Sequence, residues 1–336
     1  MMFKEVLNQL LAGQNLSHDQ MLAVMRQVMA GELTSTQIAA LLIALRLKGE
    51  SVDEIAAAAE VMRSLSTKVN ISDTKHLVDT CGTGGDGIQT FNVSTVSAFV
   101  AAAAGAKVAK HGGRSVSSTC GSADVLEALG VNVNLTPERV AQCVDEIGIG
   151  FMFAPNHHSA MKHAAPVRRE LGVRTIFNLL GPLTNPASAK RQVMGVFDKA
   201  LTSKLAQVLQ KLGSEHVLVV HGADGMDEIS FTGDTYIAEL KDGQVQEYVI
   251  NPTQFDLKVH TLKEIQVQNA DESKAIILDV LNGKKCAARD IVLLNAGAAI
   301  YVSGLTESLQ AGINKAAEVI DNGAALKKLA LLKAVS

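Results

Sequence analysis

A glycine-rich loop is the strongest chemical signal in the sequence. It spans residues 81–87 (CGTGGDG) and follows the short apolar stretch 77–80 (LVDT). Glycine permits positive φ angles and close backbone approach, so several amides of such a loop can point at one phosphate. A tight strand-to-helix turn would have the same composition. The loop alone therefore leaves phosphate binding and simple chain reversal equally open.

Two better-known phosphate motifs fit this loop poorly. Gly82, Gly84 and Gly87 match the dinucleotide fingerprint G-x-G-x-x-G, but such a match carries little weight by itself. The fingerprint also needs an acidic residue about 20 positions on, and residues 101–107 (AAAAGAK) contain none. The Walker A pattern fails because no Gly-Lys-Ser/Thr follows. A dinucleotide-dependent oxidoreductase is therefore a weak alternative.

Two further segments offer phosphate ligands. Residues 92–95 (NVST) open the next helix, whose N-terminus favours an anion and which Ser94 or Thr95 could cap. Residues 110–118 (KHGGRSVSS) follow a second strand and supply two cations, two glycines and three hydroxyls. A solvated turn could have this composition. Two such loops at the ends of successive strands nevertheless favour a phosphate site.

An adjacent pair of carboxylates, Asp227 and Glu228, lies in the segment 221–230 (HGADGMDEIS). Taken alone, such a pair usually belongs to a solvated loop. Magnesium, however, is typically held by one or two carboxylates together with substrate phosphates and waters. Combined with the phosphate loops, the pair predicts a metal–pyrophosphate site.

The fourth group of candidate residues is 157–163 (HHSAMKH), followed by Arg168. The histidines lack a convincing zinc-site companion, and no HExxH pattern occurs. We expect them at the surface or at helix starts. Arg168 could be a surface charge, but a planar guanidinium is suited to a substrate that carries a carboxylate.

Composition excludes several classes of protein. The 336 residues suit two domains, or one large domain with a helical addition. The net charge of −3 and the absence of Trp disfavour nucleic-acid binding, so any bound anion must be held locally. The longest apolar run, 96–106, is too short to span a membrane, and the first residues lack a signal-peptide core. Four cysteines without metal-ligand spacing indicate a reduced, cytoplasmic protein.

The periodicity of the chain changes near residue 76. Before it, Ser17, Thr34 and Ser51 each precede a Gln or Glu by three residues, which predicts three capped helices. The stripe Ile38, Leu41, Leu42 and Leu45 should be buried against the body or a partner subunit. After it, short strands alternate with helices, which predicts an α/β sheet with functional loops at its edge. Residues 236–250 should form a β-hairpin inserted into that scheme, and 306–332 should be helical.

The four groups of candidate residues, in this order, resemble the anthranilate phosphoribosyltransferase family. The resemblance covers nearly the whole chain and depends on the set of motifs, because no single one is specific. The matching segments are 82–86 (GTGGD), 92–95 (NVST), 110–112 (KHG), Arg114, 117–118 (SS), 121–124 (GSAD), 166–168 (PVR), 174–175 (RT), 177–178 (FN), 180–183 (LGPL), 185–186 (NP), 227–229 (DEI) and 295–296 (NA).

The resemblance implies a fold, an activity and an assembly. A small N-terminal α-helical domain (1–70, joined by helices around 165–190) should accompany a larger α/β domain (71–336) with a central, mostly parallel sheet. The implied reaction transfers phosphoribosyl from phosphoribosyl pyrophosphate to anthranilate, with Mg2+, in tryptophan biosynthesis. A homodimer is expected, with no nucleic-acid or membrane partner.

The resemblance also implies roles for individual residues. Lys110, Asp86 and Arg168 are expected to act in catalysis, and Ser94, Asp227 and Glu228 to touch magnesium directly or through water. Gly82, His111, Gly113, His158 and Arg168 should line the anthranilate site, where Arg168 would meet the carboxylate. The phosphoribosyl pyrophosphate site would comprise Gly82, Gly85, Asp86, Thr90, Asn92, Val93, Ser94, Thr95, Lys110, His111, Gly112, Gly113, Arg114, Ser115, Val116, Ser117, Ser118 and Ser122.

Three positions depart from the family pattern. Gly113 replaces an Asn that serves the acceptor, and Ser159 replaces a proline. Residues 267–275 differ from the usual helix start, a change we expect to affect only the outer scaffold.

Two further functions stay open as alternatives. A pyrimidine nucleoside phosphorylase has a similar architecture, but its lysine-rich signature has no close match here. A nucleic-acid-binding paralogue without transferase activity would show a basic surface and eroded phosphate motifs.

Overall fold

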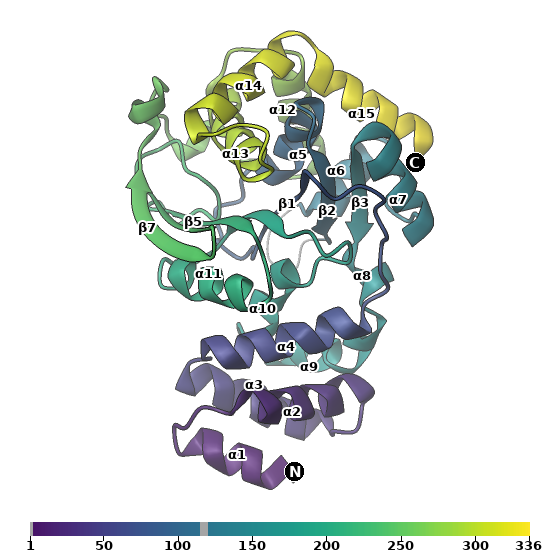
Figure 1. Cartoon of the computed structure of the whole chain (residues 1–336), viewed down its shortest axis with the longest axis vertical. Coiled ribbons are helices and arrows are strands. Elements are labelled where there is room, and N and C mark those ends of the chain that lie inside the picture. Colours follow the sequence, from purple (N-terminus) through teal and green to yellow (C-terminus); the bar gives the residue numbers. More distant parts are fainter. Residues whose placement is uncertain (1–2, 115–119) are drawn as a thin grey trace.

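A seven-stranded sheet forms the centre of the molecule (Figure 1). The computed structural model describes residues 3–114 and 120–336. The strands lie in the order β3-β2-β1-β4-β5-β6-β7; β1 to β5 are parallel, and β6 and β7 are antiparallel. This confirms the expected mostly parallel sheet. Their bounds are β1 (Leu77–Gly82), β2 (Lys107–Gly112), β3 (Ile149–Phe153), β4 (Arg191–Gly195), β5 (His216–Gly222), β6 (Thr235–Lys241) and β7 (Gln244–Ile250).

The strand order reverses direction next to β1. From β1 the chain moves to β2 and β3 on one side, and later to β4 and β5 on the other. In open α/β sheets, ligands bind in the crevice beyond the carboxyl ends of the strands at such a reversal. The glycine loop follows β1, the loop from 113 follows β2, and Asp227 follows β5, so all three predicted loops lie at this edge of the sheet.

The predicted hairpin is confirmed as β6 and β7, and it extends the edge of the sheet. Its turn contains Asp242 and Gly243 with φ angles of 50° and 72°. Two positive φ angles are what a tight two-residue hairpin turn requires.

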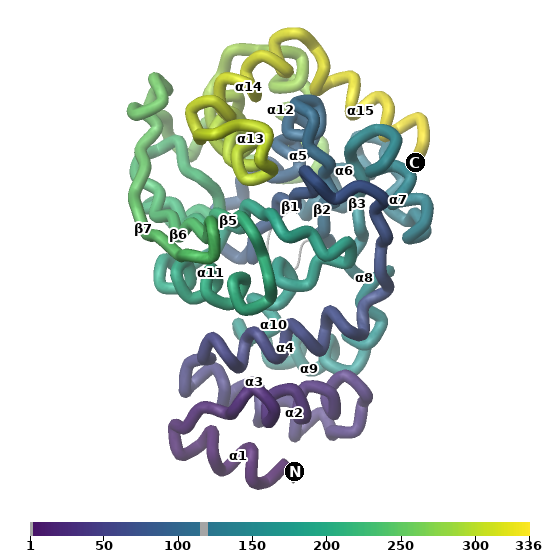
Figure 2. The backbone as a smooth tube through the Cα atoms, viewed as in Figure 1, coloured from purple at the N-terminus to yellow at the C-terminus, as the bar shows by residue number. Residues whose placement is uncertain are grey.

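Helices cover both faces of the sheet (Figures 1 and 2). The strongly apolar α5 and α13 pack together in the larger hydrophobic core. No helix in the described ranges is long and apolar enough to span a membrane. The helices of this part are α5 (Val93–Ala103), α6 (Ser122–Ala128), α7 (Pro137–Ile147), α11 (Leu201–Lys211), α12 (Ala270–Leu281), α13 (Ala287–Val302), α14 (Leu309–Asp321) and α15 (Ala324–Val335), with 3-10 turns η3 (Pro252–Phe255) and η4 (Leu262–Glu264).

A bundle of helices lies below the sheet in Figure 1 and contains the N-terminus. It consists of α1 (Phe3–Leu11), α2 (His18–Ala30), α3 (Ser35–Lys48) and α4 (Val52–Leu65). All three predicted capping boxes are present in full, and the predicted stripe on α3 is buried. The bundle shares one core with a later segment of the chain, which forms η1 (Ser159–His163), α9 (Ala165–Leu171), α10 (Phe177–Leu180) and η2 (Gly181–Leu183). The short helix α8 (Ala154–His157) precedes this segment.

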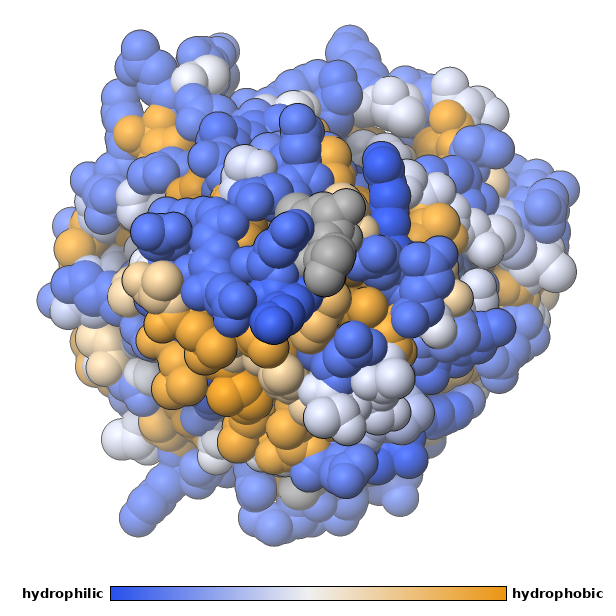
Figure 3. Space-filling view, turned by 90° about the horizontal axis from the view of Figure 1, so that it is seen from below, coloured by the Kyte–Doolittle hydropathy of each residue, from blue (hydrophilic) through white to orange (hydrophobic). Residues whose placement is uncertain are grey.

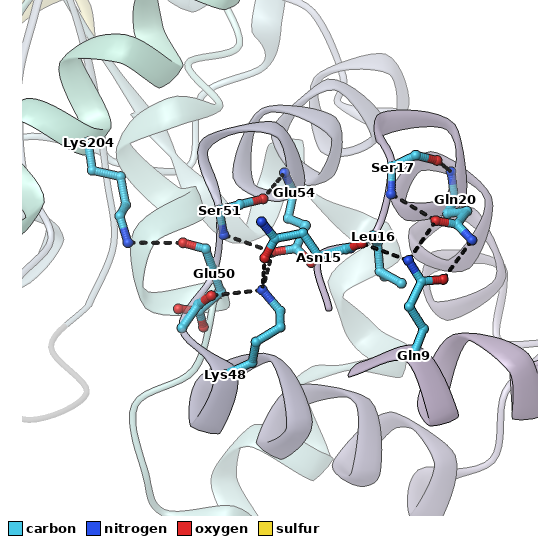
Figure 4. A network of polar contacts seen from close by, with 11 residues as sticks. Gln9, Asn15, Leu16, Ser17, Gln20, Lys48, Glu50, Ser51, Glu54 and Lys204 are labelled. Carbon is cyan, nitrogen blue, oxygen red and sulfur yellow. Dashed lines mark hydrogen bonds and ion pairs between the residues drawn. The ribbon is translucent and has the colours of Figure 1, made fainter. Parts of the chain in front are cut away.

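A buried ion pair fixes the start of α4 (Figure 4). The Glu54 carboxylate, which is fully buried, accepts hydrogen bonds from Lys48 Nζ at 2.8 Å and from the amides of Leu16 and Ser51 at 2.9 and 2.7 Å. Removing either charge would leave its partner buried and unpaired, which is strongly destabilising. Lys204 of α11 donates to the Glu50 carbonyl at 3.0 Å, so the same corner also contacts the α/β part.

Candidate active site

The glycine loop and the carboxylate loop meet in direct contact. The Gly84 amide donates to Asp227 Oδ2 at 2.8 Å. A Cβ atom on Gly82 would lie 2.3 Å from that oxygen, and one on Gly195 would lie 1.5 Å from the Asp227 carbonyl oxygen. Neither position can carry a side chain without moving Asp227. Two strand ends therefore require glycine so that the carboxylate loop can approach the sheet.

The start of α5 completes this contact. The N-cap residue is Asn92, and its side chain does not cap the helix; instead the Ser94 amide donates to Glu228 Oε1 at 3.2 Å. The expectation that Ser94 or Thr95 caps α5 is therefore wrong, because a carboxylate from a distant loop takes that place. Lys110 Nζ donates to Ser94 Oγ at 3.1 Å and to the Thr80 carbonyl. Ser94 thus links the buried lysine to the carboxylate pair.

The carboxylates of this site repel one another. Burial, and then the charge of Asp86, raise the pKa of Asp227 to about 7. Burial and Asp227 raise the pKa of Glu228 well above its usual range, and Lys110 opposes that shift. A cation between these groups would favour their ionised forms. Among the described residues no three His, Cys, Asp or Glu side chains form a complete metal site. Any cation held here must therefore draw further ligands from substrate or water.

Beneath the lysine lies a buried carboxyl that the sequence did not single out. Asp79 of β1 is fully buried and accepts hydrogen bonds from the His111 amide at 3.1 Å and from Asn185 Nδ2 at 2.7 Å. Burial raises the pKa of Asp79, and the charge of Lys110 lowers it. Asn185 also donates to the Ala109 carbonyl at 2.9 Å. The start of the loop after β2 is therefore held in place from below.

The loop after β2 is described only at its ends. Ser115, Val116, Ser117 and Ser118 lie outside the described residues. At the near end, Gly113 has an open position, since only Ala154 Cβ lies within 4.0 Å of a Cβ built there.

The two other candidate residues of this loop make contacts within the protein. Arg114 forms ion pairs with Glu127 at 2.6 Å and Asp124 at 2.8 Å, so its guanidinium lies against α6. Ser122 Oγ, at the start of α6, donates to the Gly113 carbonyl at 3.3 Å.

Residues 265–273 lie against residues 88–92, the segment between the glycine loop and α5, which we call the donor loop. The Val267 amide donates to the Gln89 carbonyl at 2.9 Å, and Thr90 forms an antiparallel bridge with Gln266. Ser273 contacts Asn92 directly. The expectation that the departure at 267–275 affects only the outer scaffold is therefore wrong: this segment touches two of the candidate donor residues.

His157 and His158, after β3, were expected at the surface or at helix starts; both are buried, and His158 immediately precedes the 3-10 turn η1. The His158 ring stands edge-on to His111, with centroids 5.1 Å apart. Burial, with the neighbouring histidines, lowers the pKa of His111 to about 3 and that of His158 to about 4. Both Nε2 atoms are buried without a hydrogen-bond partner in the described part of the chain. Two neutral imidazoles thus keep one polar atom each for a ligand.

Arg168 of α9 is half-buried over the ring of Phe177, with 5.4 Å from its guanidinium carbon to the ring centroid. Burial lowers its pKa. No ion pair joins Arg168 to a carboxylate of the described residues, in contrast to Arg114. A half-buried guanidinium without an anion is suited to bind one from outside.

Two side chains that were not assigned roles from the sequence bind the backbone of the glycine loop and of the carboxylate loop. Arg174 donates to the Gly85 carbonyl and lies over the Phe197 ring at 4.0 Å. Asn295, buried in α13, accepts from the Ile229 amide and donates to the Ile229 carbonyl, both at 2.9 Å. This pairing fixes the residue that follows Glu228. Both positions lie in matched motifs, but only the structure shows their contacts.

Comparisons with known proteins agree with this architecture. Residues 4–66 match the helical bundle domain of a glycosyl transferase family, and residues 74–326 match its a/b domain. An anthranilate phosphoribosyltransferase from Methylobacillus flagellatus is 66% identical over 333 residues, covering 99% of this chain and 98% of the relative. One from Chromobacterium violaceum is 60% identical, covering 98% and 96%.

Solved structures give the same result. The anthranilate phosphoribosyltransferase from Thermus thermophilus superposes with a TM-score of 0.93 at 43% identity, covering 98% of both chains. The Saccharomyces cerevisiae enzyme in complex with phosphoribosyl pyrophosphate and Mg gives 0.88 at 29% identity, covering 99% of this chain and 97% of that one. The yeast enzyme in complex with 4-fluoroanthranilate gives 0.89 at 27% identity, with the same coverage.

Proposed function

The chain belongs to the anthranilate phosphoribosyltransferase family, and on that premise we propose how its residues transfer phosphoribosyl from phosphoribosyl pyrophosphate to the amine of anthranilate. The observation that carries the proposal is the junction at β1, where the glycine loop, the N-terminus of α5, Lys110 and two carboxylates meet. A phosphate-binding loop beside a carboxylate pair suits a magnesium–pyrophosphate group.

The donor would bind over the glycine loop and the start of α5. The free amides of the loop and the positive end of the helix favour the phosphates. Lys110, buried and tied to Ser94, adds a positive charge. Asp86 lies beside Asp227, so it belongs to the same site.

Magnesium would be held by Asp227, Glu228 and Ser94. Their oxygens are hard ligands, and burial together with the neighbouring carboxylates raises the pKa values of Asp227 and Glu228, so a bound cation would favour their ionised forms. When bound, the ion neutralises charge on the pyrophosphate leaving group. The yeast relative, solved with both phosphoribosyl pyrophosphate and Mg, supports this proposal.

The acceptor would lie towards Arg168, His111 and His158, with Gly82 and Gly113 on its path. Arg168 supplies the charge that the anthranilate carboxylate requires. The histidines stay neutral near pH 7, because burial depresses their pKa values to about 3 and 4. They can therefore form hydrogen bonds without adding a charge next to the amine.

The chain's own groups account for the expected course of the reaction. As pyrophosphate departs, positive charge develops on the ribose ring and negative charge on the leaving group, where Lys110 stabilises it. The anthranilate amine is neutral and already nucleophilic, so positioning matters more than deprotonation. We assign no general base.

The test is direct. The purified chain is mixed with anthranilate, phosphoribosyl pyrophosphate and MgCl2, and the loss of anthranilate fluorescence is followed. We expect turnover that requires both substrates. A folded protein that leaves anthranilate unchanged would overturn the proposal.

Two features of organisation belong to the same proposal. We place the helical domain at 1–70 with additional helices around 165–190, which is supported by the core that α9 and α10 share with α2 to α4.

We also propose a homodimer formed through the helical end. Leu11 and Leu47 there are 68% and 81% exposed, and hydrophobic residues gather in a patch on this end of the molecule (Figure 3).

Light scattering should give the mass of a dimer for the wild type and of a monomer for Leu11→Glu/Leu47→Glu. A monomeric wild type would contradict the proposal.

A further inference from the structure

Asn92, at the start of α5, is held by a side chain from the other end of the sequence. Ser273 Oγ donates to the side-chain oxygen Oδ1 of Asn92 at 2.7 Å and accepts from the backbone N–H of Asn92 at 3.1 Å. The two residues are 181 positions apart, and Ser273 on α12 is fully buried. One hydroxyl therefore satisfies both the backbone donor and the side-chain acceptor of Asn92.

Cys120 contacts both ends of the Asn92 side-chain amide. Asn92 Nδ2 donates to the Cys120 carbonyl at 3.1 Å, and Cys120 Sγ donates to Asn92 Oδ1 at 3.3 Å. Cys120 is the first described residue after the loop from β2, and Gly121 and Ser122 begin α6 directly behind it. Asn92 thus connects the start of α5, the end of the second phosphate loop and α12.

The backbone around this contact is paired as well. Phe91 donates to the Ile265 carbonyl at 3.0 Å, and Val267 donates to the Gln89 carbonyl at 2.9 Å. This short ladder places the segment 265–273 along the donor loop. Ser273 lies at its far end, at the point where the donor loop turns into α5.

We propose that Ser273 is a positioning residue of the donor site, which acts through Asn92 on the start of α5 and on Cys120 at the end of the loop after β2. The proposal rests on the proposed function and adds a residue that makes no contact with substrate itself. The side chain of Asn92 makes no capping hydrogen bond to α5. Its orientation is therefore set by Ser273 and Cys120, and loss of the hydroxyl releases one side of it.

The experiment compares Ser273→Ala with Ser303→Ala. Ser303, at the end of α13, is equally buried, and its hydroxyl donates to the Ile300 carbonyl at 2.7 Å. Its own carbonyl contacts the side chains of His76, just before β1, and Arg191, at the start of β4. Binding of phosphoribosyl pyrophosphate in the presence of MgCl2 is measured by calorimetry, and the Michaelis constants of both substrates are measured by fluorescence. Thermal unfolding checks that both variants fold.

We expect Ser273→Ala to weaken donor binding about 2- to 13-fold, the range for one neutral hydrogen bond. The Michaelis constant for anthranilate should change less than twofold. Ser303→Ala should change neither donor binding nor the anthranilate constant. In an Asn92→Ala background, Ser273→Ala should add less than it does in the wild type, because the bond to the Asn92 side chain is already lost and only the bond to the backbone amide of residue 92 remains.

Three results would overturn the inference: unchanged donor binding in folded Ser273→Ala, an equal rise in both substrate constants, or full additivity with Asn92→Ala. If Ser273→Ala does not fold, Ser273→Cys keeps the shape of the side chain with a larger atom and a weaker donor, and it must itself raise the Michaelis constant for phosphoribosyl pyrophosphate. A wild-type chain without transferase activity would refute the proposed function. Wild-type activity with an unaffected serine variant would refute only the role of Ser273.

Discussion

Removal of the Arg168 guanidinium tests the acceptor site most sharply. Arg168 is half-buried and stacked over Phe177, and it has no carboxylate partner among the described residues. A charge-assisted hydrogen bond contributes about 1.5–3 kcal/mol, so its loss should raise the anthranilate Michaelis constant roughly 10- to 150-fold. The constant for phosphoribosyl pyrophosphate should stay near its wild-type value.

Three variants separate charge from packing. Arg168→Ala removes both, whereas Arg168→Met retains an apolar stem over Phe177 and removes only the charge. Arg169→Ala is the matched control, because its side chain is the exposed neighbour on α9. Fluorescence kinetics on these variants should show the same large increase for the first two and none for the third.

A second substrate makes the test specific for the carboxylate. In 2-aminobenzamide a neutral amide replaces the carboxylate, so the penalty of Arg168→Met should largely disappear when binding of this analogue is measured. An equal penalty for both ligands would show that Arg168 does not meet the carboxylate. An increase in the donor constant instead would assign Arg168 to the phosphate site.

Three further changes have defined outcomes. Asp227→Ala/Glu228→Ala should weaken the magnesium dependence of activity while the thermal unfolding temperature is kept, and an unchanged magnesium titration would refute the metal assignment. Gly113→Asn should lower the Michaelis constant for anthranilate about 2- to 13-fold, the range for one neutral hydrogen bond, without altering the constant for phosphoribosyl pyrophosphate. If only the variant turns over anthranilate, the natural chain has another acceptor. Because the pKa values of His111 and His158 are depressed to about 3 and 4, the unfolded chain binds more protons below about pH 6.5. The free energy of unfolding should therefore fall as pH drops from about 6.5 towards 4. Urea titrations of His111→Gln/His158→Gln should show a free energy of unfolding that depends less on pH.

Local signals in the sequence predicted the elements that depend on local contacts. Each capping box joins residues three positions apart, so Ser17, Thr34 and Ser51 predicted the starts of α2, α3 and α4. The hairpin turn at Asp242 and Gly243 is equally local. Helix α12 has a comparable signal, because Asn269 caps it and Glu272 follows three positions later, but neither α12 nor α13 was predicted individually.

Contacts between distant residues could not be predicted in the same way. Hydrophobic periodicity identifies which face of an element is buried, but not which polar group lies opposite. The pairing of Ser273 with Asn92, the burial of His158 and the ion pairs of Arg114 all depend on how the chain crosses itself. The sequence therefore identified the loops of the site, while the supports beneath them came from the structure.

The shared core of the helical bundle has a consequence during synthesis. Helices α1 to α4 leave the ribosome first, yet the residues that complete their core, within 164–183 and 194–240, follow at least roughly 100 positions later. At about 5–20 residues per second, the apolar face of α4 stays exposed for at least about 5–20 s before these residues are made. The N-terminal helices are thus the first part of the chain to be made, but they cannot finish folding until most of the parallel sheet has been translated.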